Sequence, residues 1–208
     1  CILAIMRFTQ LFTKTRREAP KDAKAMNHIL LVRGGFIYKN SSGIYTFLPL
    51  GWRVIQKITG IIREEMNKIS GVEIFMPALI EKKYMEATGR WEVPIGFKIR
   101  NPKSEVRNKS EIQNSKQEEN DGEEFVLGWS HEDLLTELTS HYINSREDLP
   151  FAAYQIQTKF RNEPRAKSGL LRGREFMMKD LYSFHADEKD FERYYEEVLN
   201  RKANGLFG

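Results

Sequence analysis

The stretch from Tyr154 to Tyr182 constrains the fold of this chain more than any other. Apolar and polar residues alternate over residues 154–163, and alternation returns over residues 172–182 after a basic loop that contains glycine. Successive side chains of a strand leave opposite faces of a sheet, so this pattern predicts two strands joined by the loop. One face of the first strand should carry Tyr154, Ile156, Thr158 and Phe160.

The polar face of this predicted pair carries a graded set of hydrogen-bonding and charged groups. In the first strand these are Gln155, Gln157, Lys159, Arg161 and Glu163. In the second strand that face holds Arg172, Arg174, Phe176, Met178, Asp180 and Tyr182. If the two faces coincide, guanidinium groups, an aromatic ring and carboxylates share one surface, which suits a nucleotide. The stretch therefore predicts a nucleotide site.

The composition bounds the class of protein. A chain of 208 residues can bury one real core, and 40% hydrophobic with 30% charged residues is typical of a soluble protein. The net charge of +4 permits a polyanionic partner without demanding one. Cys1 is the single cysteine, which excludes an internal disulfide framework and fits a reducing compartment. Because no apolar run approaches membrane-spanning length, we expect a cytoplasmic protein without a membrane partner.

Other periodicities predict a mixed chain of helices and strands. Apolar residues at helical spacing predict helices over 23–32, 51–69 and 187–198, and a further helix that opens after Ser130. Strand signals occur in a hairpin around the Ser-Ser-Gly turn at 41–43, over 72–77 and over 124–128. Ser130 and Asp133 have the spacing of a capping box, so helix capping is one structural role open to Ser130.

Residues 98–122 differ from their surroundings. The hexapeptide at 103–108 is followed by a near-duplicate at 109–114, and almost all neighbours are polar or charged. Such a segment buries too little apolar area to offset its ordering entropy, so we expect a low-complexity, disordered insertion. Its interleaved acids and bases disfavour a nucleic-acid arm. Met6 suggests that residues 1–5 are an upstream extension, which leaves 6–97 and 123–208 as the core.

Several blocks resemble a known family. The sequence Phe160-Arg161-Asn162-Glu163, the basic loop and Arg172-x-x-x-Phe176 resemble motif 2 of the class II aminoacyl-tRNA synthetases. The helix at 51–69 and the strand after it resemble motif 1, the dimer-forming element. Narrower blocks are similar to the bacterial-type prolyl-tRNA synthetases: SSGIYTFLPLGWRV, TGRWE, FVLGWSHEDLLTEL, YQIQTKFRNEPR and REFMMKDLYSFH.

The resemblance implies a fold and an activity. It implies an α+β fold in which helices flank an antiparallel sheet, incomplete in this chain. The implied activity is that of a proline–tRNA ligase, which forms prolyl-adenylate from proline, ATP and Mg²⁺ and transfers the prolyl group to tRNA(Pro). It also implies a homodimer built through motif 1. No residue is assigned to a metal site.

For ATP, the resemblance implies roles residue by residue. Arg161 would be catalytic, bridging the α-phosphate and the substrate carboxylate, because a planar guanidinium suits two anions. Glu163 would accept from the adenine amino group, Arg172 would hold the γ-phosphate and Phe176 would stack on adenine. The structural alternatives are a surface salt bridge for Arg161 and core packing for Phe176.

For proline, the resemblance implies a pocket that involves Arg161 and Glu132, which matches the carboxylate that receives the secondary ammonium. Ser130 replaces a threonine of the family, and Trp129 replaces a proline, which puts the local backbone path in doubt. His131 is expected to face elsewhere. Three residues would line the pocket more loosely, or alternatively pack in the core: Met178, Asp180 and Tyr182. Arg165 and Lys167 would approach the tRNA acceptor end, or remain solvated loop charges.

Parts of the family pattern are not found in these residues. Motif 3, an editing insertion and an anticodon-binding domain are absent from the sequence as given. We therefore expect this polypeptide alone to bind ATP weakly and not to charge tRNA efficiently. Two other functions stay open: a class II synthetase of another specificity, such as threonyl or seryl, and an inactive synthetase-like binding or regulatory protein.

Overall fold

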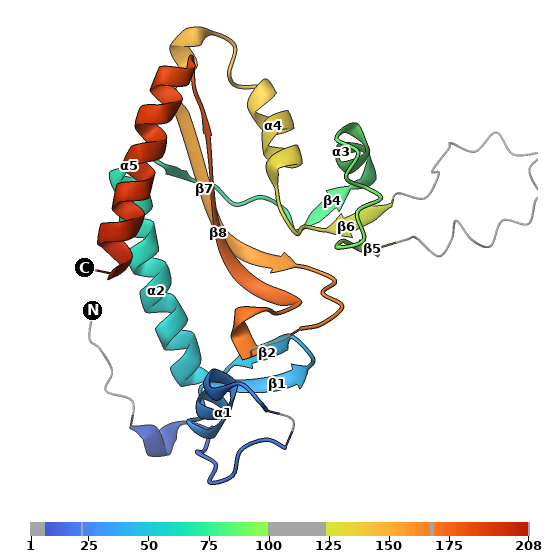
Figure 1. Ribbon diagram of the computed structural model, residues 1–208, viewed down its shortest axis with the longest axis vertical. Coiled ribbons are helices and arrows are strands. Elements are labelled where there is room, and N and C mark those ends of the chain that lie inside the picture. Colours follow the sequence, from blue (N-terminus) through green and yellow to red (C-terminus); the bar gives the residue numbers. More distant parts are fainter. Residues whose placement is uncertain (1–6, 22, 100–123, 167–168, 208) are drawn as a thin grey trace, which may run out of the picture.

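The computed structural model describes residues 7–21, 23–99, 124–166 and 169–207, which form three small sheets and several helices (Figure 1). The helices are α1 (Met26–Arg33), α2 (Pro49–Lys68), α3 (Lys82–Ala87), α4 (Glu132–Ser140) and α5 (Glu188–Phe207), with the 3-10 turns η1 (Phe8–Gln10), η3 (Arg146–Asp148) and η4 (Gly169–Leu171). The strands are β1 (Ile37–Ser41), β2 (Ile44–Phe47), β3 (Val72–Glu73), β4 (Leu79–Glu81), β5 (Phe97–Ile99), β6 (Phe125–Leu127), β7 (Phe151–Phe160) and β8 (Glu175–Phe184). The predicted α+β class is confirmed.

Two predicted segments fall largely outside the described residues. The expected extension at 1–5 lies entirely outside them, and so do residues 100–122 of the expected insertion. The first two residues of that insertion, Lys98 and Ile99, belong to β5 and pair with Val126 and Phe125 of β6. Regular structure therefore extends two residues further than predicted.

A long antiparallel hairpin of β7 and β8 runs through the centre of the structure (Figure 1). All ten residues of each strand are paired, from Phe151 with Phe184 to Phe160 with Glu175. The short strand β3 pairs in parallel with β7, so the sheet order is β3-β7-β8. The two strands predicted from alternation are confirmed, although the second begins at Glu175 rather than near Arg172.

The pairing register shows how the two polar faces are related. Residues directly opposite each other in an antiparallel ladder direct their side chains to the same face of the sheet. Gln155 lies opposite Asp180, and Lys159 lies opposite Phe176. The polar faces of the two strands therefore coincide, which is the condition for one shared site.

The apolar face of the hairpin packs against α2 and α5, which lie along it (Figure 1). The core on this side contains the buried residues Met66, Ile69 and Tyr154, with Ile62, Ile156, Leu181, Tyr194 and Val198 partly buried around them. Ile62 and Met66 of α2 face this core, one turn apart as helical spacing requires, whereas Ile58 and Ile61 of the same helix are exposed. The helix predicted over 51–69 is confirmed, with Pro49 in its first turn.

The polar face of β7 is buried rather than open to water. Gln155 and Lys159 are fully buried, and Gln157 is nearly so. The backbone at Met76 crosses this face: its N–H donates to Gln155 Oε1 at 3.2 Å, and its carbonyl accepts from Gln157 Nε2. The two glutamines thereby satisfy backbone groups that burial would otherwise leave unpaired.

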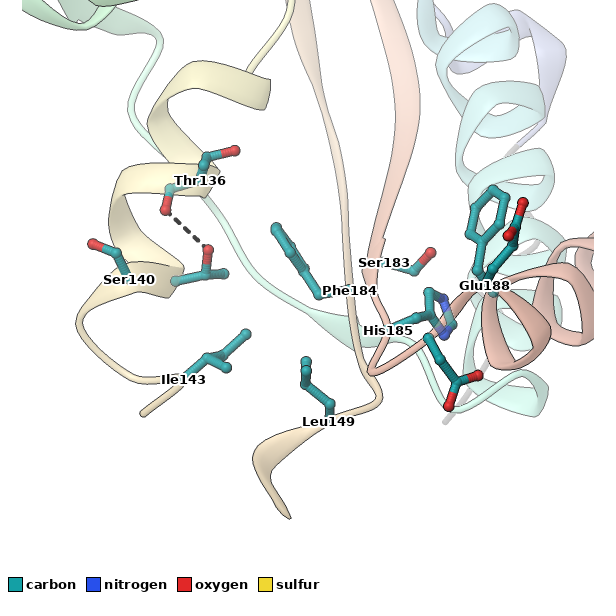
Figure 2. Close-up of a pocket in the computed structure, with 11 residues that line it drawn as sticks. Thr136, Ser140, Ile143, Leu149, Ser183, Phe184, His185 and Glu188 are labelled. Atoms are coloured by element: carbon teal, nitrogen blue, oxygen red, sulfur yellow. Dashed lines mark hydrogen bonds between the residues drawn. The ribbon is translucent and has the colours of Figure 1, made fainter. Parts of the chain in front are cut away.

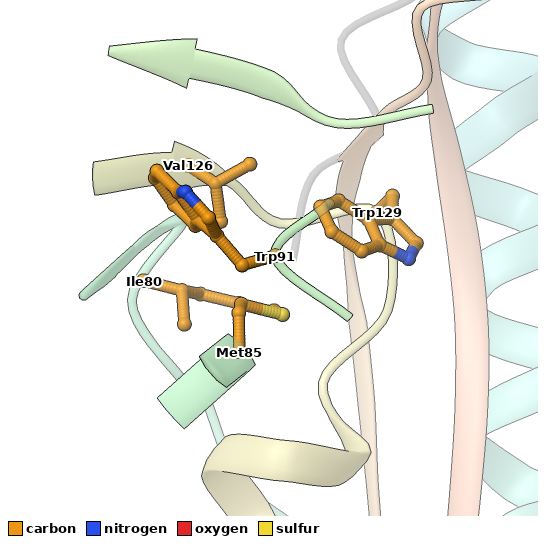
Figure 3. Packing of buried hydrophobic residues seen from close by; sticks show 5 residues of the cluster. All are labelled: Ile80, Met85, Trp91, Val126 and Trp129. Atoms are coloured by element: carbon orange, nitrogen blue, oxygen red, sulfur yellow. The ribbon is translucent and has the colours of Figure 1, made fainter. Parts of the chain in front are cut away.

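A second core lies where β4, β6 and β5 form an antiparallel sheet beside α3 (Figure 3). Its buried residues are Ile80, Met85, Trp91, Val126 and Trp129. A Cβ atom at Gly96 would come within 2.4 Å of the Trp129 ring, so glycine at this position makes room for the tryptophan. The tryptophan that replaces the family's proline at this position is therefore buried, and the backbone after Trp129 still leads directly into α4.

The N-terminal elements contact the loop between β7 and β8. Helix α1 and the β1–β2 hairpin are confirmed, with Gly43 at φ +76° in the hairpin turn. The Gly43 carbonyl accepts from the backbone N–H of Arg174 at 2.7 Å. The hairpin tip therefore supports the end of the basic loop just before β8 begins.

The predicted capping box at the start of α4 is wrong. The N-cap residue is His131, and no side chain caps this helix end. The Asp133 carboxylate instead accepts from Thr88 Oγ1 at 2.6 Å and pairs with Arg90 at 2.7 Å. Asp133 thus pairs with residues of a neighbouring segment and does not take part in a capping box.

In the ranges that the structure describes, no helix combines the length and apolar character that a membrane crossing requires. The same residues contain no group of three or more His, Cys, Asp or Glu side chains placed to hold a metal ion.

Candidate active site

Arg161 follows directly on the last residue of β7 and faces the second strand. Its backbone N–H donates to the Arg174 carbonyl at 2.8 Å, which closes the strand end. Its guanidinium carbon lies 5.3 Å from the centre of the Phe176 ring, and one terminal nitrogen donates to the Trp129 carbonyl at 3.4 Å. Among the described residues, Arg161 Nε is buried without a hydrogen-bond partner. The protein therefore leaves part of the hydrogen-bonding capacity of this guanidinium unsatisfied.

Glu163 and Arg172 are paired with each other. Arg172 donates to Glu163 Oε2 from Nε at 3.0 Å and from a terminal nitrogen at 2.9 Å. The Glu163 side chain is 11% exposed, whereas that of Arg172 is 63% exposed. Arg174 Nε donates to the Glu163 carbonyl at 2.9 Å and holds the backbone of the loop. Two predicted ATP ligands thus lie together, one nearly buried and the other largely exposed.

The predicted tRNA contacts lie in the loop between these residues. Arg165 is exposed, and Lys167 lies outside the described residues. The geometry thus places one basic side chain at the surface near the predicted adenine contacts.

Glu132 is the first residue of α4, and its side chain is 55% exposed. Its carboxylate pairs with Arg90 at 3.1 Å, and the same Arg90 nitrogen reaches Asp133. The guanidinium of Arg90 also lies 5.6 Å from the Trp129 ring centre. Arg90 was not among the predicted site residues. It lies in the TGRWE block, and a basic residue within a block that resembles the family is the signal that could have pointed to it. Ser130, directly before His131, is partly exposed.

Asp180 is the centre of a buried network on β8. Its Oδ2 atom accepts from Gln155 Nε2 at 2.9 Å, Lys159 Nζ at 2.8 Å and the Tyr182 hydroxyl at 2.7 Å. Its Oδ1 atom is buried and has no hydrogen-bond partner within the described part of the chain. Met178, the third residue of the predicted lining, lies opposite Gln157 on the same face.

The prediction that His131 faces away from the candidate site is wrong. His131 is fully buried, its Nδ1 atom contacts Lys159 Nζ, and its Nε2 atom lies 3.0 Å from the Pro77 carbonyl. Its backbone N–H donates to the Tyr182 hydroxyl at 3.2 Å. His131 therefore joins the turn before Glu132 to the face that carries Asp180.

Burial controls how these groups titrate. Desolvation, with a further contribution from the Lys159 ammonium, lowers the pKa of His131. Desolvation also lowers the pKa of Lys159, although Asp180 opposes it, and raises the pKa of Tyr182, where Asp180 adds to the effect. His131 is thus neutral near pH 7, and Tyr182 keeps its proton to donate to Asp180.

An open groove of about 720 Å³ lies elsewhere, between α4, the end of β8 and the start of α5 (Figure 2). Its lining includes the apolar side chains of Ile143, Leu149, Phe184 and Phe191. A smaller pocket of about 410 Å³ between α3 and α4 includes Glu132 in its lining. Of the predicted ligand residues, only Glu132 is in the described lining of these two cavities, and it lines the smaller one.

Comparison with known proteins shows what the chain is similar to. Residues 113–204 match the model of the tRNA synthetase class II core domain (G, H, P, S and T). The chain is 43% identical over 199 residues to a proline–tRNA ligase of Geobacillus kaustophilus, covering 96% of this chain and 32% of that protein. It is 44% identical over 202 residues to that of Dehalococcoides mccartyi, with the same coverage. The chain thus spans about a third of these relatives' length.

Solved structures agree on the fold. The prolyl-tRNA synthetase of Cryptosporidium parvum complexed with L-proline and AMP aligns with a TM-score of 0.67 at 18% identity, covering 84% of this chain and 32% of that chain. That of Giardia lamblia in complex with prolyl-adenylate gives 0.66 at 20% identity, covering 83% and 33%. By sequence, part of the chain matches the class II tRNA synthetase core domain and the relatives that it matches are proline–tRNA ligases, whereas the solved structures share its fold.

Proposed function

We propose that this chain is part of a proline–tRNA ligase and contributes most of the site that activates proline with ATP. The observation that carries the proposal is the 43–44% identity to proline–tRNA ligases over nearly the whole chain. The shared polar face of β7 and β8 supports it, because cationic, aromatic and carboxylate groups converge there. Solved neighbours in complex with AMP, proline or prolyl-adenylate are consistent with this chemistry.

In the proposed reaction, the proline carboxylate attacks the α-phosphorus of MgATP and pyrophosphate leaves. The carboxylate is already a nucleophile, so placement and charge neutralisation can supply the catalysis without a general base. Arg161 is suited to hold both anions, because a guanidinium can bind two of them, and its Nε atom has no partner among the described residues. Magnesium enters bound to the phosphates of ATP.

The adenine end of the site involves Phe176, Glu163 and Arg172. Adenine would stack on Phe176, and Glu163 would accept from its amino group. For this, the exposed Arg172 would leave Glu163 and move to the γ-phosphate. The pair thus acts as a resting arrangement in which each ligand neutralises the other until ATP arrives.

The amino-acid end of the site lies between α4 and β8. Glu132 is proposed to receive the secondary ammonium of proline after exchanging Arg90 for the substrate. Asp180 offers its unpaired Oδ1 atom as a further acceptor. Ser130, Met178 and Tyr182 complete the proposed lining.

The remaining partners follow from the family. Transfer of the prolyl group would need tRNA(Pro), whose acceptor end is proposed to meet the basic loop that contains Arg165 and Lys167, and we propose a cytoplasmic location. A homodimer through α2 and β3 would cover exposed apolar side chains, including Ile58, Ile61 and Phe75. Analytical ultracentrifugation of Ile61→Glu should show a dimer converted to monomer, and an unchanged sedimentation profile would contradict this assignment.

Amino-acid-dependent exchange of pyrophosphate into ATP tests the proposed function. In the protein that contains this chain, proline should support exchange, and threonine and serine should not. Exchange with another amino acid would reassign the specificity within class II. Absence of exchange with any amino acid, in a folded protein that still binds ATP, would favour a synthetase-like binding protein.

A further inference from the structure

A buried lysine without a role in the proposed chemistry contacts Asp180, one of the residues proposed for the amino-acid pocket. The Lys159 side chain is fully buried, and its Nζ atom contacts both Asp180 Oδ2, at 2.8 Å, and His131 Nδ1. Burying an ammonium group is costly even when it is paired, and an apolar side chain of similar volume would avoid that cost. The charge therefore calls for an explanation other than packing.

The contacts of Lys159 connect three separate segments. From β7 it reaches Asp180 on β8 and His131 in the turn before α4. His131 in turn reaches the Pro77 carbonyl after β3, and its backbone N–H reaches the Tyr182 hydroxyl. One neutral tautomer satisfies every contact: Nε2–H donates to Pro77, and Nδ1 accepts from Lys159. Burial and the nearby ammonium lower the pKa of His131, which favours this neutral form.

We propose that Lys159 is a positioning residue for the amino-acid pocket, which holds Asp180, Tyr182 and the His131 turn in one arrangement. The consequence for Asp180 is specific. Its Oδ2 atom takes all three donors from Gln155, Lys159 and Tyr182, so the buried Oδ1 atom is left without a partner among the described residues. Fixing His131 also fixes the backbone from which Glu132 projects. This inference rests on the proposed function, because the pocket is the one proposed for proline.

Replacing the lysine should affect proline more than ATP. In Lys159→Met, Asp180 keeps two neutral donors but loses its counter-charge, and His131 Nδ1 loses its donor. The carboxylate can then turn or bind a proton, and the geometry of the pocket loosens. The hydrogen bonds and ion pairs described for Arg161, Glu163 and Arg172 do not include Lys159, so the ATP end should be less affected.

The kinetic test uses pyrophosphate exchange in the protein that contains this chain. Lys159→Met should raise KM for proline by about tenfold or more, since small displacements of positioned groups cost up to about a hundredfold. KM for ATP should change less than about threefold, and the exposed Lys189→Met should match the unsubstituted protein. A purely structural role predicts a lower yield of folded protein, with both KM values unchanged in the fraction that folds. That result, or equal rises in both KM values, would overturn the proposal.

A second readout does not depend on activity. In the ¹⁵N-labelled 208-residue chain, the His131 amide donates to the Tyr182 hydroxyl, so hydrogen exchange at this amide reports directly on that hydrogen bond. Exchange in Lys159→Met should be at least about tenfold faster than in Lys189→Met. If hydrogen exchange at the His131 amide is unchanged, the proposal fails, whatever the kinetics show. If the unsubstituted protein lacks proline-dependent pyrophosphate exchange but Lys159→Met speeds hydrogen exchange at this amide, the proposed function fails and the positioning role stands. Should Lys159→Met not fold, Lys159→Gln, which keeps a donor without the charge, replaces it in both experiments.

Discussion

Individual side chains at the candidate site differ in how their neighbours hold them. Glu163 and Arg172 pair with each other, and Glu132 pairs with Arg90, so these groups must exchange partners before they bind a ligand. Arg161 has one long hydrogen bond and a ring contact, and its Nε atom has no partner among the described residues. At the scale of single residues, Arg161 is thus the group most available for substrate.

Arg161→Ala should abolish adenylate formation and leave the fold intact. The loss removes charge stabilisation at the α-phosphate, which for a positioned donor typically changes the rate by about 10²–10³ or more. Proline-dependent pyrophosphate exchange measures the activity, and the thermal unfolding midpoint measures the fold. Normal exchange in this variant would refute the α-phosphate contact.

Arg90→Ala should lower the free energy of unfolding by about 1–3 kcal/mol, because the buried Asp133 carboxylate would keep only Thr88 as a partner. Urea unfolding of the chain measures the difference. Arg146→Ala is the matched control, because the pair of Arg146 with Asp187 is exposed on both sides and should contribute at most about 1 kcal/mol. Equal effects of the two substitutions would contradict the role assigned to Arg90.

At the scale of elements, helix α2 contains two glycines in different surroundings. Gly51 lies in the first turn, where a Cβ atom would come within 2.1 Å of the Phe36 carbonyl. Gly60 lies in the middle of the helix, where a Cβ atom would meet nothing within 4 Å. The first glycine allows the helix to approach the start of β1 closely, and the second has no packing reason to be glycine.

Opposite effects are expected when each glycine is replaced by alanine. Gly51→Ala should destabilise the chain by about 1–3 kcal/mol, because the backbone at Phe36 must move. Gly60→Ala should stabilise it by about 0.5–1 kcal/mol, through the lower conformational entropy of the unfolded chain. Urea unfolding at one pH measures both values. Stabilisation by Gly51→Ala would show that the close approach is not a constraint.

For the molecule as a whole, buried groups link stability to pH. The pKa of His131 is lowered from 6.5 in the folded state, and Lys159, Asp180 and Glu132 are the charged groups that act on it. The unfolded chain therefore binds a proton near pH 6.5 that the folded chain resists, so stability is lost as pH falls below that value. Carboxylates whose pKa values are lowered in the fold, Glu73 by Arg63 and Asp190 by His185, extend the loss to more acidic pH.

Replacing His131 tests whether this residue causes the loss of stability as pH falls. The free energy of unfolding in urea should fall between pH 7 and 5 for the unsubstituted chain, and should be nearly flat there for His131→Gln. His141→Gln, which replaces an exposed histidine of α4's C-cap, should retain the slope. If His131→Gln also retains the slope, another group causes it.

The sequence alone predicted most of the local structure and named the residues of the candidate site. Alternation predicted β7 and β8 and the residues on each face, and helical spacing predicted α2, because both periods arise within a few consecutive residues. The family resemblance supplied ligand roles for residues that the fold brings together in pairs, such as Arg161 with Phe176.

The tertiary structure decided which of those groups are covered, paired or free. The backbone that buries the polar face of β7 comes from Met76, and the partner of Glu132 is Arg90. Lys159 and His131 meet across 28 positions of sequence. Such contacts depend on how distant segments pack and on the burial that makes an ion pair necessary, and neither is encoded in a local period. The alternation thus specified a face, and packing made part of it a buried network behind the proposed pocket.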